Sequence, residues 1–90
     1  MPWTVKLSTK ATNYFDHLDK NLRKRIKEGL REMAALDQPL SHPKAQPLTG
    51  ALKGFNRLHI GGYRVVFSLL PAERIVAVVS IRPRGDVYKK

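Results

Sequence analysis

The chain has 90 residues, enough for one domain spanning residues 1–90, and 17 Lys and Arg against 7 Asp and Glu give it a formal net charge of +10. This excess predicts a polyanionic partner, namely a nucleic acid, an anionic membrane surface or an acidic protein. The absence of cysteine excludes disulfides, thiolate zinc sites and cysteine nucleophiles, and it fits a reducing cytoplasm.

The N-terminal residues predict a strand. Trp3, Val5 and Leu7 alternate with polar residues, a period-two pattern typical of a half-buried strand. The same stretch lacks the apolar run of a signal peptide. The longest apolar run of the chain, residues 75–79, is far too short to cross a bilayer, so we expect a cytoplasmic protein with no membrane segment.

Two amphipathic helices follow this strand. Ser8 or Thr9 can cap the first helix, whose apolar face consists of Ala11, Tyr14, Phe15 and Leu18. Residues 19–21 supply a turn or cap before the second helix, whose apolar face consists of Leu22, Ile26, Leu30 and Met33. The opposite side of the second helix carries a cationic stripe of Lys20, Lys24, Lys27 and Arg31. A solvated face would look the same, but no acid interrupts the stripe, so we single it out for contact with phosphate.

The second half of the chain predicts a β-meander. Pro39, Pro43 and Pro47 exclude a regular element from residues 37–49, which we expect to run as an extended connection over the surface. Strand patterns follow around residues 57–60, 63–70 and 74–82, separated by Gly61-Gly62 and by a turn at residues 71–73. The expected fold class is α+β: an N-terminal strand, a two-helix hairpin and a three-stranded antiparallel meander, forming one sheet packed on the helices.

Most familiar catalytic sites are absent from the sequence. No Gly-rich loop precedes a helix, no serine lies in a nucleophile elbow, and the acids are too scattered for a paired-carboxylate mechanism. His17, His42 and His59 lack ligand spacing with carboxylates. We therefore expect neither a metal ion nor a small-molecule cofactor.

A set of arginines remains in the β half. Arg57 and His59 are two residues apart on one predicted strand, so their side chains share a face of the sheet. The strand after the Gly-Gly turn and the end of the chain add Arg64, Arg82, Arg84 and Tyr88. Arginines of this kind can merely keep a sheet soluble. Because few acids lie near them, we favour a single cationic patch.

Two segments of the chain carry distinctive motifs. In residues 52–67, Leu52-Lys53-Gly54 leads into a basic strand, a short turn and Tyr63-Arg64-Val65. In residues 81–89, basic residues are followed by Asp86-Val87-Tyr88. Both segments resemble those of the RelE/ParE family of toxins, and together with the helix pair that precedes the meander the resemblance covers nearly the whole chain.

The resemblance implies a RelE-like fold and a toxin of a type II toxin–antitoxin system, neutralised by a cognate antitoxin whose acidic, amphipathic segment wraps the toxin. RelE-like members cleave mRNA in the ribosomal A site, whereas ParE-like members poison DNA gyrase. The local residues favour a RelE-like, ribosome-dependent and metal-independent mRNA endonuclease. On this resemblance the catalytic residues are Arg57, Arg64, Arg82, Arg84 and Tyr88. We expect RNA contacts from Lys20, Lys24, Lys27, Arg31, Lys53, His59 and Lys89.

RNA supplies its own nucleophile, the 2′-OH, so such an enzyme has to align this oxygen with the phosphate and stabilise the developing charge. We expect Arg64 and one of Arg82 or Arg84 to hold the phosphate through the planar guanidinium fork, and Arg57 to neutralise charge in the transition state. Tyr88 would stack on a base or take part in proton transfer. The expected products are a 2′,3′-cyclic phosphate or 3′-phosphate and a 5′-hydroxyl.

The general base is the least defined part of this mechanism, because arginine cannot serve at neutral pH. Related toxins often have Lys or Arg two residues after the position of Arg57, where this chain has His59. His59 is a candidate base, a phosphate contact or an exposed strand residue. The alternatives to an mRNA endonuclease are a gyrase inhibitor, a non-catalytic nucleic-acid-binding module and a degenerate toxin that binds its antitoxin without cleaving.

Overall fold

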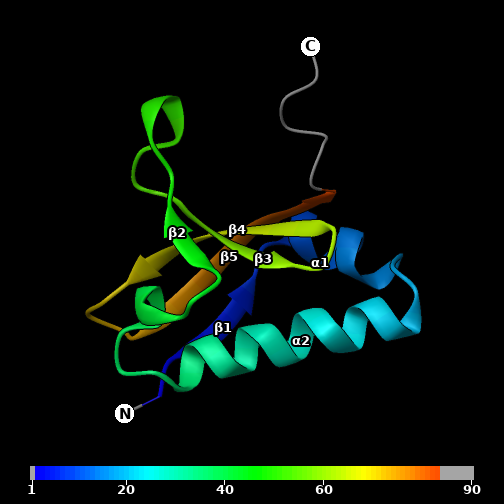
Figure 1. Cartoon of the computed structure of the whole chain (residues 1–90), viewed down its shortest axis with the longest axis horizontal. Helices are drawn as coiled ribbons and strands as arrows, with labels where there is room; N and C mark the ends of the chain where they lie inside the picture. Colours follow the sequence, from blue (N-terminus) through cyan, green and yellow to red (C-terminus); the bar gives the residue numbers. More distant parts are fainter. Residues whose placement is uncertain (1, 84–90) are drawn as a thin grey trace.

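The structure is a computed structural model that describes residues 2–83. Its elements in chain order are β1 (Thr4–Leu7), α1 (Thr9–Asp16), α2 (Lys20–Ala35), η1 (Pro39–Ser41), β2 (Ala45–Pro47), η2 (Gly50–Leu52), β3 (Asn56–Ile60), β4 (Tyr63–Leu70) and β5 (Ile75–Pro83), where η marks a short 3-10 helix. The predicted α+β class is confirmed, and Figure 1 shows one sheet lying across the long helix α2.

Both helices begin at the residues whose side chains can satisfy a free backbone N–H of the first turn. The hydroxyl of Ser8 accepts from the N–H of Ala11 at 3.0 Å, and a carboxylate oxygen of Asp19 accepts from the N–H of Leu22 at 2.8 Å. Of the two predicted caps for the first helix, Ser8 is therefore the one used. None of the helices in residues 2–83 is long and apolar enough to span a membrane.

The sheet has five strands in the order β1-β5-β4-β3-β2. The predicted meander β3-β4-β5 is antiparallel throughout, whereas β1 joins its outer edge parallel to β5, with Val5 opposite Val76. The chain between β1 and β5 contains the helix pair and β2 to β4, so it is long enough for the crossover that a parallel neighbour requires. In the turn between β3 and β4, Gly61 has a φ of 57°, a left-handed conformation that glycine adopts without strain.

The prediction that residues 37–49 form no regular element is wrong. Pro39 begins η1, and Ala45–Pro47 pairs with β3 as the fifth strand of the sheet, with Ala45 opposite Leu58. Proline is compatible with both places because the first residue of a helix needs no N–H partner and an edge strand has one side without a neighbour. The three prolines therefore limit the length and position of these elements without excluding them.

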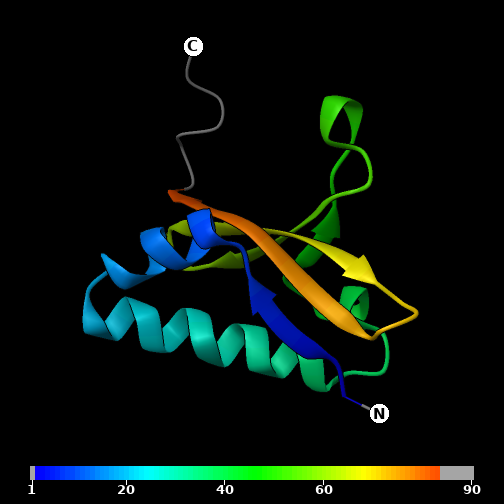
Figure 2. The same cartoon turned by 180° about the vertical axis from the view of Figure 1, so that it is seen from behind.

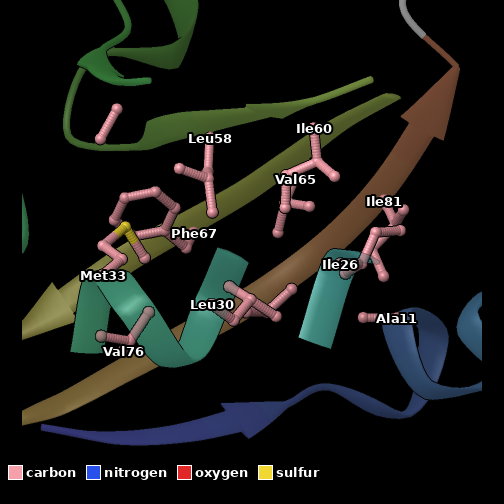
Figure 3. Close-up of a cluster of buried hydrophobic side chains, with 12 residues drawn as sticks. Ala11, Ile26, Leu30, Met33, Leu58, Ile60, Val65, Phe67, Val76 and Ile81 are labelled. Carbon is pink, nitrogen blue, oxygen red and sulfur yellow. The ribbon is translucent and has the colours of Figure 1, made fainter. Parts of the chain in front are cut away.

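The hydrophobic core lies between α2 and one face of the sheet (Figure 3). α2 contributes Ile26, Leu30 and Met33, each at most 5% exposed, as the predicted apolar face requires. The strands and α1 contribute the facing side chains, among them Ala11, Leu58, Val65, Phe67, Val76, Val78 and Ile81. Both views show the opposite face of the sheet without a covering helix, and the loop that carries η2 projects on that side (Figure 2).

Candidate nucleic-acid interface

A row of cationic or titratable side chains crosses the helix-free face of the sheet. His59 on β3 is directly opposite Arg64 on β4, which is directly opposite Arg82 on β5. Residues directly opposite in an antiparallel ladder point to the same face, with Cβ atoms about 5 Å apart. Since the alternating neighbours Leu58, Val65 and Ile81 lie in the core, this row points away from the helices. The predicted convergence of these residues on one patch is thus present.

A second row, two residues along the strands, contains Arg57. It runs from Gln46 on β2 through Arg57 and Val66 to Ser80 on β5. The Arg57 guanidinium donates to the side-chain oxygen of Gln46 at 2.6 Å, and its Nε atom is buried with no hydrogen-bond partner in residues 2–83. The edge strand β2 therefore fixes the direction of Arg57.

A hollow of about 360 Å³ opens on this face around Arg64 and Arg82. Arg64 is only 4% exposed, whereas Arg82 is exposed, so Arg64 lies deep and Arg82 at the rim. The remaining lining is mainly apolar and comes from Leu52, Phe55, Val66, Val79 and Ser80. Two guanidinium groups beside apolar walls suit a ligand that is both anionic and flat, such as a nucleotide.

A register shift shapes the wall of this hollow. Val66 pairs with Ser80 but the next residue, Phe67, pairs with Val78, so Val79 has no partner on β4. The hydroxyl of Ser8 donates to the carbonyl oxygen of Val79 at 3.1 Å and so supports the irregular strand. Irregularities of this kind occur next to active sites because they re-aim side chains, and here Val79 lines the hollow.

Other predicted contact residues lie on different parts of the surface. Lys53 is exposed at the end of η2, on the loop that projects from the helix-free side (Figure 1). The stripe of Lys20, Lys24, Lys27 and Arg31 lies on α2, across the sheet from the arginine rows. Lys27 and Arg31 line a separate groove of about 440 Å³ with apolar residues of β1. Arg84, Tyr88 and Lys89 lie outside the described residues.

Sequence reasoning missed the contribution of β2. Lys44 and Gln46 line a hollow of about 280 Å³ together with Arg57 and His59, and the carbonyl oxygen of Lys44 accepts from the N–H of His59 at 3.0 Å. The local sequence does not signal this strand, because three prolines surround it and its pairing with β3 depends on tertiary structure. Lys44 adds a further cation to the edge of the patch.

Comparison with known proteins places this arrangement in a family. The family model described as "ParE toxin of type II toxin-antitoxin system, parDE" matches residues 5–88. No curated protein matches the chain.

Several solved structures share the fold. The chain is similar to one from the RelBE2 toxin–antitoxin complex of Mycobacterium tuberculosis, with 22% identity over 96% of this chain and 95% of that chain and a TM-score of 0.81. It is similar to one from the RelE–RelB complex of Pyrococcus horikoshii, with 24% identity, coverage of 96% and 99%, and a TM-score of 0.76. The isolated RelE toxin of E. coli matches with 22% identity, coverage of 96% and 90%, and a TM-score of 0.69.

At these identities the structural matches establish the fold, and they confirm the predicted RelE-like architecture. The family model extends over both segments on which the resemblance was based. The chain therefore belongs to the RelE/ParE superfamily and is a toxin of a type II toxin–antitoxin system.

Proposed function

We propose that this toxin is a ribosome-dependent endonuclease that cleaves mRNA through the 2′-OH of the RNA itself. The observation that carries the proposal is the row of His59, Arg64 and Arg82 across three adjacent strands, beside an apolar hollow. Cleavage of this kind needs positioning and charge stabilisation and no further cofactor, and a preorganised set of guanidinium groups supplies both.

We propose a role for each member of the patch. Arg64, at the floor of the hollow, holds the scissile phosphate, and Arg82 binds a second phosphate oxygen from the rim. Arg57, oriented by Gln46, neutralises the charge that develops on the phosphate. His59 is directly opposite Arg64 in the ladder, and we propose its imidazole as the general base. The proposed roles of Arg84 and Tyr88 remain those given by the family resemblance.

We further propose two macromolecular partners. Since the solved relatives include toxin–antitoxin complexes, we expect a cognate antitoxin, and an acidic segment of it would complement the cationic face. The ribosome is the second partner, which places the activity in the cytoplasm. The exposed Lys20 and Lys24 on α2 would then contact ribosomal RNA while the opposite face holds the mRNA.

The chemistry is tested with a single-atom change in the substrate. An mRNA is prepared with one 2′-deoxynucleotide at a mapped cut and is presented on purified ribosomes. The proposal predicts that the cut disappears at that position only, and that cuts elsewhere end in a cyclic phosphate or 3′-phosphate. A cut that persists at the deoxynucleotide would mean that the nucleophile is not the 2′-OH.

A second candidate function is inhibition of DNA gyrase, which the family model favours because its description names a ParE toxin. The purified toxin is added to gyrase and relaxed plasmid, and supercoiling is measured beside the mRNA assay. Inhibition of supercoiling without mRNA cleavage would support this candidate. If the toxin binds nucleic acid but neither inhibits supercoiling nor cleaves mRNA, the protein is a non-catalytic nucleic-acid-binding module.

A further inference from the structure

A second hollow adjoins the first across β5. It has a volume of about 370 Å³, close to that of the first, and is lined by Lys10, Asn13, Tyr14, His17, Ser80, Ile81, Arg82 and Pro83. Ser80 and Arg82 line both hollows, so the two sites share a wall. We call the second one the α1 hollow.

The strand arrangement explains why this hollow exists. β1 pairs with β5 only as far as Val78, so no strand of the described residues flanks the segment from Val79 to Pro83 on its outer side. α1 runs beside this segment instead, as Figure 2 shows. A helix beside a strand end leaves more space than a second strand would, and polar residues of α1 border that space.

The lining of the α1 hollow favours an anionic ligand with a flat apolar part. Lys10 and Arg82 give it positive charge, and none of the described lining residues carries a carboxylate. Tyr14 and Pro83 supply apolar surface. These are the features of a site that binds a phosphate and stacks a base.

His17 has a defined hydrogen-bonding state at this site. Its Nδ1 atom lies 2.7 Å from the carbonyl oxygen of Asn13, and a carbonyl only accepts, so Nδ1 carries the proton. This arrangement leaves Nε2 as an acceptor in the neutral ring. Together with the amide of Asn13, it gives the hollow polar groups that can read the edge of a base.

We propose that the α1 hollow holds the nucleotide that adjoins the cleaved bond, so that the RNA strand crosses β5 over Arg82 with one nucleotide in each hollow. The inference rests on the proposed function and deepens it. Arg82 then binds the phosphate between the two nucleotides, and α1 contributes to the choice of sequence. The near-equal volumes, the shared Arg82 and the cationic lining favour RNA over a protein segment as the occupant.

Photocrosslinking tests the position of the strand directly. An mRNA carries 2′-deoxynucleotides at the mapped cut, which prevent cleavage, and 4-thiouridine on one side of the cut or the other. After irradiation with full-length toxin on ribosomes, the toxin is digested with trypsin and the crosslinked peptide is identified. One of the two 4-thiouridine positions is expected to label residues 11–20, the tryptic peptide that contains Tyr14 and His17.

The possible outcomes distinguish a failure of the α1 hollow proposal from a failure of the endonuclease proposal. Crosslinks to the β3–β5 face without any to residues 11–20 overturn the α1 hollow and leave the endonuclease proposal standing. An absence of crosslinks to the toxin at either position also overturns the α1 hollow, whereas the endonuclease proposal fails only if no cut can be mapped in the first place. If the antitoxin, added alone, crosslinks to residues 11–20 through a photoreactive side chain while the mRNA does not, the occupant is the acidic protein segment.

Kinetics provide the second measurement. Lys10→Ala combined with His17→Ala changes two exposed side chains, so the fold is retained. The pair is expected to raise the toxin concentration needed for half-maximal cleavage about tenfold and to leave the saturated rate within twofold. Lys6→Ala, an exposed lysine that lines neither hollow, is the matched control. Equal behaviour of the double variant and the control would overturn the inference.

Discussion

Arg57 donates to the side-chain oxygen of Gln46 at 2.6 Å, directly across the ladder that joins β2 to β3. A three-residue edge strand thus positions a guanidinium group that the proposed mechanism places on the transition state. On the proposed mechanism β2 acts through this contact, since its contribution to the core is the small side chain of Ala45.

Removal of the Gln46 amide tests that contact. Gln46→Ala is expected to lower the saturated rate of mRNA cleavage about 10- to 100-fold, since a small misplacement of a catalytic group has an effect of this size. Gln46→Glu would still accept from the Arg57 guanidinium, but the new carboxylate would offset the positive charge of Arg57. The cleavage rate of this variant should therefore fall as well. Urea unfolding serves as the control, because Gln46 is exposed and its free energy of unfolding should change little. A Gln46→Ala toxin that cleaves like the wild type would disconnect β2 from the chemistry.

Arg82 is the most accessible member of the row and the clearest test of phosphate binding. Arg82→Ala is expected to reduce cleavage about 100-fold, the size of effect seen when one donor to a developing oxyanion is removed. Arg82→Lys keeps the charge but loses the planar fork, so it should recover only part of the activity. Rates are measured at saturating toxin on programmed ribosomes. Full activity in Arg82→Ala would remove Arg82 from the mechanism.

The stripe on α2 is expected to act on binding and not on chemistry. Lys20→Glu combined with Lys24→Glu should weaken association with the ribosome and make it less dependent on salt, because two fewer phosphate contacts release fewer counterions. The saturated cleavage rate should stay unchanged, since α2 lies across the sheet from Arg64. Sedimentation with ribosomes at several salt concentrations measures the effect. A loss of saturated rate with normal association would contradict this division of roles.

Substitutions in the core are expected to change the free energy of unfolding and not the catalytic residues. Ile26 is fully buried between α2 and the sheet (Figure 3), so Ile26→Val should lower the free energy of unfolding by about 0.5–1.5 kcal/mol. Leu52→Ala removes a larger group, but Leu52 is 44% exposed, so its effect should stay within about 0.5 kcal/mol. Urea unfolding of both variants compares them, and a larger loss in Leu52→Ala would show that the η2 loop has a structural role.

The N-terminal cap of α2 is also expected to contribute to the free energy of unfolding. Asp19→Ala removes the acceptor of the Leu22 N–H and should lower the free energy of unfolding by about 1 kcal/mol. Asp19→Asn retains an oxygen at the same place and should lose much less. Asp16→Ala is the control, since it removes an exposed carboxylate that does not cap a helix. Equal losses in Asp19→Ala and Asp16→Ala would argue against the cap.

The patterns that predicted the fold correctly were those with a strong period. The helical period of α2 identified buried residues such as Ile26, and the alternation in β3 identified Leu58 and Ile60, which are buried in the structure. The strands β4 and β5 were recognisable as apolar runs between turn residues. The strand β2 escaped prediction because its pairing depends on β3, a partner distant in sequence, and not on its own composition. Its one proline, Pro47, is compatible with an edge position that no local pattern reveals.

The residues of the candidate site could be predicted from the sequence, but how deeply each side chain is buried could not. Side-chain alternation placed Arg57 and His59 on one face, and the hairpin turn placed Arg64 near them, as the register confirms. That Arg64 is nearly buried while Arg82 is exposed depends on the projecting η2 loop and on the register shift at Val79. The α1 hollow depends on where β1 stops, which is a tertiary property.

Primer extension on an mRNA in a purified translation system detects the proposed cleavage itself. It is carried out with and without ribosomes, with the wild-type toxin and with Arg82→Ala. We predict cuts within codons that require ribosomes and are strongly reduced in the variant. A well-folded wild-type toxin that leaves the mRNA intact on translating ribosomes would contradict the endonuclease proposal, and the supercoiling assay would then decide whether gyrase is the target.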